Sequence, residues 1–258
     1  MVRLSARHRA AVKRAADRVG LLGPLYSLRE RWRLARDGGE EVDDLPPPGL
    51  RALIGSPSAA WFVAAGRLSE DALSKAASAR GFDLNDPSVD VLDFGCGCGR
   101  TSRHWQRPIQ GTDISPDLVG WCQENLPGVY IVNDPEPPTL YPHSSFDVVY
   151  AVSVFTHLTA ERQQRWLEEF ARTIRPDGLL LLTTHGDRLA AEALSDAELR
   201  DYRSGRIVVC YSNHEGSNLC AAHHPARSLA QLTDEFEVVD HLVEALPPGH
   251  DIQVLVRT

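Results

Sequence analysis

The sequence contains no apolar run long enough to cross a bilayer, and its N-terminus has no apolar segment of the secretory type. We therefore expect no membrane span and a cytoplasmic location. The five cysteines are an odd number in a chain without an export signal, so we expect reduced thiols rather than disulfides. With 258 residues, 43% of them hydrophobic and 24% charged, the chain suits one α/β domain with additions.

Charge is unevenly distributed along the chain. The net charge is −8, yet residues 1–37 contain ten basic side chains and three acidic ones. The remainder is strongly acidic, which argues against broad binding of nucleic acid, whereas the basic segment alone suits an anionic partner.

This basic segment predicts two helical pieces within residues 1–36, separated by Gly20, Gly23 and Pro24. In the second piece apolar residues recur at helical spacing between arginines: Leu25, Leu28, Trp32 and Ala35. A basic amphipathic helix suits a membrane surface, RNA or a protein partner. We expect instead an arm packed through its apolar stripe, with solvated arginines. Acidic residues and prolines then predict an extended linker, so we divide the chain into an arm with linker, residues 1–48, and a main domain, residues 49–258.

Residues 91–100, VLDFGCGCGR, predict a strand, a tight turn and the opening of a helix at about residue 101. Glycines at alternate positions let a ligand approach the backbone, and a helix N-terminus favours negative charge. A dinucleotide fingerprint has the spacing G-x-G-x-x-G, whereas here the third glycine comes one residue earlier and Asp93 precedes the first by two.

A strand-then-helix rhythm follows and predicts parallel strands. The expected strands are residues 109–113, 130–134, 146–153 and 179–184, with helices at 116–125 and 160–174 and a terminal hairpin at 236–242 and 251–257. Further helices are expected at about 69–81, with Ser69 as N-cap, and at 227–235; Ser115 is the expected N-cap of the helix from 116. Between about 187 and 225 the rhythm lapses, and we interpret this segment as a cover over the carboxyl edge of the sheet.

Three segments, D-x-G-x-G-x-G, FDVVYAVSVFTHL and RPDGLLLLT, stand in one order and together resemble class I S-adenosylmethionine-dependent methyltransferases over about residues 88–186. The resemblance implies a Rossmann-like sheet of seven mostly parallel strands with an antiparallel C-terminal strand, helices on both faces, and S-adenosyl-L-methionine as cofactor. The chain adds an N-terminal helical extension to this fold.

The resemblance also implies cofactor-binding residues. Asp93 is placed to meet the amino group of the methionine part, Asp113 the ribose hydroxyls, Asn133 or Asp134 the adenine amino group, and Ile114 the adenine face. The whole set is Asp93, Gly95, Cys96, Gly97, Gly99, Asp113, Ile114, Asn133, Asp134 and Ser153. Two alternatives remain: Asp113 as a simple helix-start carboxylate, and residues 133–135 as a turn. The same pocket is an expected place for Trp61, Phe62 and Gly66. Core packing is the alternative for the two aromatic side chains.

The implied reaction is displacement at a methyl carbon, for which alignment suffices unless the acceptor must lose a proton. We name His157 and His185 as candidate catalytic bases, because histidine titrates near neutrality; packing or helix capping is the alternative for His157. We expect no metal site. Cys96 and Cys98 sit in a glycine turn that holds thiolates poorly, and His223 with His224 suits surface or acceptor contact better than a metal.

Methylation of nucleic-acid bases is disfavoured by two absences. Residues 153–156 are Ser-Val-Phe-Thr where base methyltransferases have Asn/Asp-Pro-Pro-aromatic, and no Pro-Cys occurs. A small-molecule acceptor remains, with its methylated atom and the oligomeric state left open. The alternatives are a catalytically silent cofactor-binding or partner-binding module and, third, a nicotinamide-dependent oxidoreductase.

Overall fold

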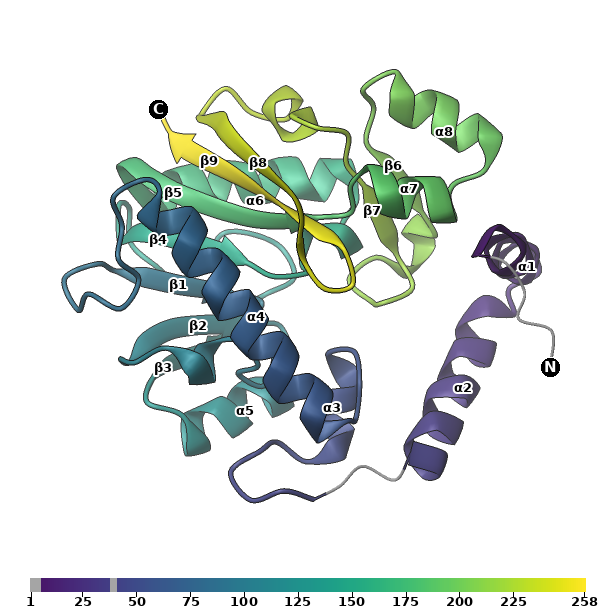
Figure 1. The fold of residues 1–258 in the computed structure, drawn as a ribbon, viewed down its shortest axis with the longest axis horizontal. Helices are drawn as coiled ribbons and strands as arrows, with labels where there is room; N and C mark the ends of the chain where they lie inside the picture. The colour runs from purple at the N-terminus through teal and green to yellow at the C-terminus, as the bar shows by residue number, and fades with distance from the viewer. Residues whose placement is uncertain (1–5, 38–40) are drawn as a thin grey trace.

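The computed structural model describes residues 6–37 and 41–258 (Figure 1). In that part of the chain seven strands form one sheet in the order β3-β2-β1-β4-β5-β9-β8. The strands are β1 (Val91–Phe94), β2 (Ile109–Asp113), β3 (Gly128–Val132), β4 (Phe146–Ala151), β5 (Ile174–Thr184), β8 (Phe236–Leu246) and β9 (His250–Arg257). Neighbours among β1 to β5 are parallel, while β9 runs antiparallel to both β5 and β8. The predicted fold class is confirmed.

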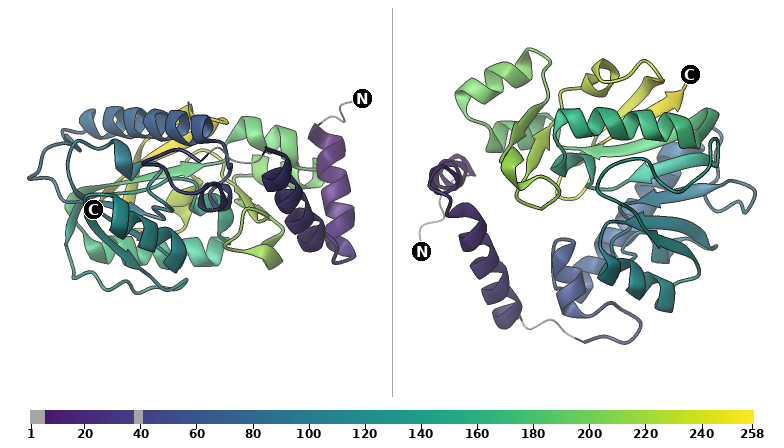
Figure 2. Two further views of the ribbon diagram at one scale, coloured as in Figure 1. Left: turned by 90° about the horizontal axis from the view of Figure 1, so that it is seen from below. Right: turned by 180° about the vertical axis from the view of Figure 1, so that it is seen from behind.

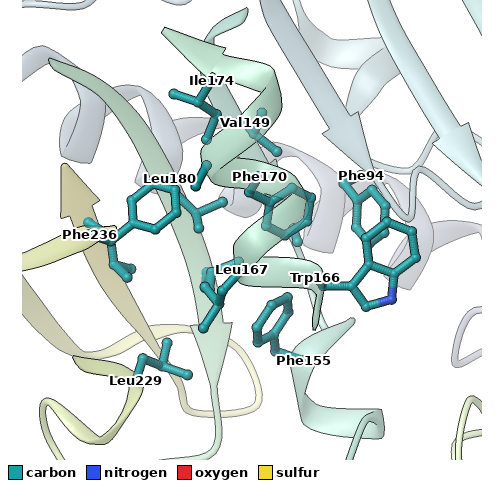
Figure 3. Close-up of a cluster of buried hydrophobic side chains, with 14 of the residues drawn as sticks. Phe94, Val149, Phe155, Trp166, Leu167, Phe170, Ile174, Leu180, Leu229 and Phe236 are labelled. Atoms are coloured by element: carbon teal, nitrogen blue, oxygen red, sulfur yellow. The ribbon is translucent and has the colours of Figure 1, made fainter. Parts of the chain in front are cut away.

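Helices cover both faces of this sheet. Helix α4 (Ala59–Ser78) lies on one face, and α5 (Pro116–Asn125) and α6 (Ala160–Thr173) lie on the other (Figure 2). Strand β5 serves both cores because successive side chains point to opposite faces. Leu179 and Leu181 pack on the side of α4 with Leu73. Leu180 packs with Leu167 of α6 (Figure 3).

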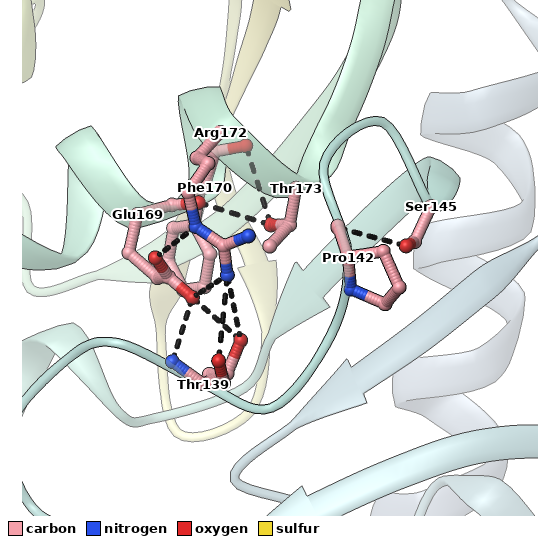
Figure 4. A network of polar contacts seen from close by, with 7 residues as sticks. All are labelled: Thr139, Pro142, Ser145, Glu169, Phe170, Arg172 and Thr173. Carbon is pink, nitrogen blue, oxygen red and sulfur yellow. Dashed lines mark hydrogen bonds and ion pairs between the residues drawn. The ribbon is translucent and has the colours of Figure 1, made fainter.

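A buried polar network joins the loop after β3 to α6 (Figure 4). One carboxylate oxygen of Glu169 accepts hydrogen bonds from the Thr139 amide at 2.7 Å and the Thr139 hydroxyl at 2.5 Å. The Arg172 guanidinium donates to both oxygens of the same carboxylate, at 2.6 and 2.8 Å. The network offsets the cost of burying the Glu169 charge and fixes this loop against the sheet.

Residues 187–225 fold as a small unit beside the carboxyl edge of the sheet. It contains α7 (Asp187–Ala193), α8 (Asp196–Arg203) and a hairpin of β6 (Val208–Cys210) and β7 (Ala221–His223). Leu194, Leu199 and Tyr202 are buried in a cluster of its own. His185 at the end of β5 bridges to His223, which ties the unit to the main sheet.

The N-terminal arm forms the two expected helices, α1 (Ala6–Arg18) and α2 (Leu22–Asp37). The break falls at Gly20, which has φ +70°, while Pro24 lies in the first turn of α2, where a missing amide hydrogen is tolerated. Residues 1–5 of the predicted arm and 38–40 of the predicted linker lie outside the described residues. Helix α3 (Pro48–Leu53) follows. None of the described helices is long and apolar enough to cross a membrane.

Three local predictions were wrong. The helix expected at residue 101 is one 3-10 turn, Ser102–His104, because the Ser102 hydroxyl bonds Asp93 and Trp105 then turns inward to donate to the Tyr150 hydroxyl. Ser58, not Ser69, caps α4; Ser69 lies mid-helix and donates to the Ala65 carbonyl.

The helix expected at 227–235 is likewise one 3-10 turn, Ser228–Gln231. The Thr233 hydroxyl accepts a hydrogen bond from the Glu235 amide at 3.1 Å, and such a local bond competes with helix continuation. The third strand also begins two residues earlier than expected, at Gly128.

Candidate functional site

A cavity of about 500 Å³ opens at the carboxyl ends of β1, β2 and β4, where open α/β sheets bind ligands. Nine residues named from the sequence line it: Asp93, Gly95, Cys96, Gly97, Asp113, Ile114, Asn133, Ser153 and His157. Three others, Gly99, Asp134 and His185, are not among its lining residues. Tertiary structure thus brings together residues spread over sixty-five positions of sequence.

The glycine turn after β1 forms the floor of this cavity. Gly95 and Gly97 have φ of +76° and +56°, a region that side chains with a Cβ rarely occupy. A Cβ on Gly95 would lie 2.3 Å from Cγ2 of Val154, which also lines the cavity, so no side chain fits between the turn and this residue. The glycines therefore leave the backbone of the turn open to the cavity.

Asp113 at the end of β2 supports the glycine turn. Its Oδ2 accepts a hydrogen bond from the Gly97 amide and its Oδ1 accepts one from the Ser115 amide, both at 2.9 Å. Burial raises the pKa of the Asp113 carboxyl, and these amides partly oppose the rise. Ser115 occupies the predicted N-cap position of α5, but its side chain makes no capping bond, and its amide donates instead to the carboxylate of Asp113.

Asp93 lies at the inner end of the cavity and is almost fully buried. Burial raises the pKa of its carboxyl to about 6, although the Ser102 hydroxyl donates to it at 2.5 Å. The side chain therefore combines a negative charge at neutral pH with a low-dielectric surrounding, which strengthens its attraction for a cation.

His157 follows β4 in a 3-10 turn, Phe155–His157, and lines the cavity. Its Nδ1 lies 2.8 Å from the carbonyl oxygen of Cys220. Since a carbonyl only accepts, Nδ1 carries the proton and Nε2 keeps its lone pair. Burial lowers the pKa of the imidazole, so the ring is neutral at pH 7. This is the state that a general base requires.

Comparison with known proteins agrees with this geometry. Residues 92–182 match the family described as methyltransferase domain. This match covers about a third of the chain and agrees with the resemblance of residues 88–186 to class I S-adenosylmethionine-dependent methyltransferases.

One similar curated protein is the 2-methyl-6-phytyl-1,4-hydroquinone methyltransferase of Synechocystis sp., at 30% identity over 116 residues, or 42% of this chain. The match spans about a third, 36%, of that protein. Two solved structures share the fold. Magnesium protoporphyrin IX methyltransferase from Synechocystis has a TM-score of 0.53 and 16% identity, covering 76% of this chain and 86% of that chain. A SAM-dependent methyltransferase from Methanosarcina mazei has a TM-score of 0.50 and 18% identity, covering 66% and 92%.

Two of the predicted cofactor-binding residues, Gly99 and Asp134, lie outside the cavity lining. Gly99 has φ +74°, and a Cβ there would lie 2.2 Å from Cδ1 of Leu126, so this glycine permits close packing against the end of α5. Asp134 is exposed outside the cavity, while Asn133 lies at its edge and accepts a 2.8 Å hydrogen bond from the Thr112 hydroxyl.

His185 does not meet the cavity. Its ring is buried, 5.2 Å from the ring of His223 and 4.8 Å from that of His250, measured between centroids. Burial and these neighbouring rings lower the pKa of His185 strongly. His250 in turn lies 3.3 Å, Nδ1 to Oγ, from Ser153, which lines the cavity with a strained φ of +64°. His185 is therefore not among the described residues that line the cavity, and its candidate role as a catalytic base stays a prediction.

The expectation of surface or acceptor contact for His223 and His224 was wrong, because both are buried and neither lines the cavity. His224 Nε2 lies 3.1 Å from Oε1 of Gln163. The cysteines of the glycine turn are free thiols packed in the core, and burial raises the pKa of Cys98 to about 12. Across the described residues no group of three or more His, Cys, Asp or Glu side chains is arranged to hold a metal ion.

Sequence reasoning missed Arg100, which follows the third glycine directly. Its guanidinium lies 5.2 Å from the centroid of the Trp61 ring, and the residue lines the cavity. Burial lowers the pKa of the guanidinium, but arginine stays protonated in proteins. The position of Arg100 directly after the glycine motif was the sequence feature that could have indicated a place in the cavity. Phe62 packs in the core, as the alternative held, and Gly66 faces the Arg100 carbonyl oxygen, 2.0 Å from where a Cβ would be.

The 187–225 unit closes one side of the cavity. The Gly216 amide donates to the His157 carbonyl at 2.9 Å, and the Thr159 amide donates to Oε1 of Glu215 at 2.6 Å. Asn218 reaches across to the Leu53 carbonyl at 3.1 Å. The segment expected as a cover therefore contributes three residues, Glu215, Gly216 and Asn218, to the lining.

Proposed function

We propose that this protein transfers a methyl group from S-adenosyl-L-methionine to a small-molecule acceptor by direct in-line displacement. One observation carries the proposal: a single cavity is lined by the glycine turn, by Asp113 and by His157 with a free Nε2 lone pair. When bound, the cofactor supplies an electrophilic methyl group on a sulfonium. The protein then has to hold the two reactants in line and accept a proton.

The lining residues fit the parts of this cofactor. Asp113 accepts the ribose hydroxyls with the lone pairs that Gly97 and Ser115 leave unused, and Ile114 and Asn133 border the adenine. At the other end Asp93 attracts the amino group. Arg100, which sequence reasoning did not include, supplies a half-buried positive charge for the carboxylate. The cavity volume lies within the range of small-ligand sites.

His157 acts as general base toward a hydroxyl or protonated nitrogen of the acceptor. The carbonyl of Cys220 holds the ring in one tautomer and one orientation, so Nε2 keeps its lone pair at a residue that lines the cavity. The acceptor side of the cavity is largely apolar through Val154, Leu158 and Trp166, with Glu215 and Asn218 at the rim. A mostly apolar acceptor with one or two polar atoms suits this lining, and the hydroquinone for which the curated relative is named is of that type.

Calorimetric titration of the full chain tests the proposal. S-adenosylmethionine and its demethylated product should both bind, and NAD should not. A preference for NAD would reject the proposal in favour of an oxidoreductase. Methyl transfer to a panel of phenols, amines and carboxylates is then followed by mass spectrometry. Cofactor binding without methyl transfer to any of these compounds would favour the catalytically silent module instead.

A further inference from the structure

The apolar stripe of the arm is more than half exposed to solvent. Leu25, Leu28 and Trp32 are 53%, 64% and 58% exposed, and Leu21, just before α2, is also exposed. Their spacing of three and four residues places them on one face of the helix. The sequence-based expectation that this stripe packs the arm onto the domain was therefore wrong. What holds the arm lies elsewhere.

The arm is anchored through α1. Arg14 forms an ion pair with Glu198 of α8 at 2.5 Å and donates to the Ala193 carbonyl at 2.7 Å. Asp17 lies 3.3 Å from Nε2 of His214. Because these polar contacts use α1, the exposed face of α2 is left facing solvent while its start stays fixed to the 187–225 unit.

The chemistry of the exposed stripe is that of an interfacial helix. Leucines and a tryptophan form its centre, and arginines at positions 29 and 31 fall on either side of it by helical spacing. A helix that combines Leu and Trp with flanking Arg binds the headgroup region of anionic bilayers, where the apolar side chains enter the acyl boundary and the guanidinium groups meet phosphates.

The uneven charge of the chain favours one orientation of the protein on an anionic surface. Residues 1–37 carry an excess of seven positive charges, whereas the rest of the chain is strongly acidic. An anionic surface therefore attracts the arm and repels the main domain. A large acidic protein would meet the same attraction, but the exposed Leu and Trp side chains favour a surface with an apolar interior.

The arm also lies next to the mouth of the cavity. Helix α2 contacts α3, which ends at the cavity-lining residue Leu53 (Figure 1). The start of α2 meets the other rim, since a Cβ on Gly23 would lie 3.5 Å from Cε1 of His214, two residues before the cavity-lining Gly216. A surface that binds α2 therefore lies beside the opening of the cavity between Leu53 and Gly216.

We propose that α2 docks this protein on an anionic lipid bilayer and so places the cavity mouth at the membrane surface, where apolar acceptors dissolve. Docking itself is independent of the reaction; the delivery of an acceptor rests on the proposed methyl transfer.

Co-sedimentation of the full chain with vesicles tests the docking. Binding should occur to vesicles of phosphatidylglycerol with phosphatidylcholine, should weaken with added salt, and should be at least about tenfold weaker to phosphatidylcholine alone. The double variant Leu28→Glu with Trp32→Glu should lose about tenfold or more of the affinity. The matched control is Leu140→Glu, at a leucine that is 86% exposed away from the arm, which should bind as the parent does.

Two measurements separate the outcomes. Titration with S-adenosylmethionine should give the same affinity for the parent and the double variant. If the parent does not bind this cofactor, the proposed function fails while the vesicle result stands. No vesicle binding, or a dimer in light scattering that the double variant abolishes, would overturn membrane docking. Such a dimer would identify a second copy of this chain as the occupant of the stripe. Equal affinity for both vesicle types would overturn the role of anionic lipid in docking.

Discussion

The backbone amide of Gly97 donates a 2.9 Å hydrogen bond to the carboxylate of Asp113, so the glycine turn after β1 is joined directly to the end of β2. The two segments that are expected to bind opposite ends of a cofactor are therefore hydrogen-bonded to each other without it. This makes the binding surface rigid before any ligand arrives, which lowers the entropy cost of binding.

We expect Asp113→Ala to weaken binding of S-adenosylmethionine by about tenfold to a hundredfold, because two hydrogen bonds to a charged acceptor that shape the turn are lost together with the ribose contact. Calorimetry measures the change. Asp117→Ala, at an exposed carboxylate in the first turn of α5, is the control and should bind normally. Unchanged affinity of Asp113→Ala would remove the ribose assignment.

Gly99→Ala should lower the free energy of unfolding by about 1–3 kcal/mol, since the new methyl group meets Leu126 at a φ of +74°. Gly120→Ala, within α5, has open space around its Cβ and should raise stability by up to about 1 kcal/mol. Urea unfolding compares the two. Equal effects would show that Gly99 is replaceable and that close packing does not require it.

His157→Gln should lower kcat by about a hundredfold or more while leaving the affinity for the cofactor unchanged. Its pKa lies below the ordinary histidine value, so the parent enzyme should keep its kcat/KM through neutral pH and lose it only in acid, as the imidazole takes up a proton. The variant should lack this acid limb. His143→Gln, at an exposed histidine, is the control, and a fully active His157→Gln would exclude the ring from the reaction.

Arg172→Met should cost about 2 kcal/mol of stability at neutral pH, because it leaves the buried Glu169 carboxylate without its guanidinium. Burial alone would raise the pKa of Glu169, but hydrogen bonds from Arg172 and Thr139 outweigh it and lower the pKa below 4.5. Because the pKa of this carboxyl is lower in the folded state than in the unfolded state, its charge stabilises the fold at pH values above the ordinary pKa. This stabilisation is lost as the pH falls through the folded-state pKa.

The gap between the parent and Arg172→Met should therefore narrow between neutral pH and about pH 3 in urea titrations. Arg165→Met removes an exposed ion pair on the same helix and should change stability little at any pH. A gap that stays constant with pH would mean that the charge of Glu169 does not contribute.

Much of the site was predictable because strand ends in a parallel sheet meet at one edge. The positions of Asp93, Asp113 and His157 follow from where three apolar runs end, and they line one cavity. His185 also ends a strand but turns into a cluster with His223 and His250, which lie far from it in sequence. The direction of such a side chain depends on neighbours that no local pattern specifies.

The amino-acid sequence by itself determined the glycine turn and the approximate positions of the main strands, because apolar runs and turn residues act over short stretches of chain. The fold class followed from the resemblance of its motifs to a known family. Only the tertiary structure decided that Gly99 packs against Leu126, that Arg100 enters the cavity and that the stripe of α2 faces solvent. Each of these depends on which distant surface a side chain meets, and local patterning predicts an apolar face without specifying its partner.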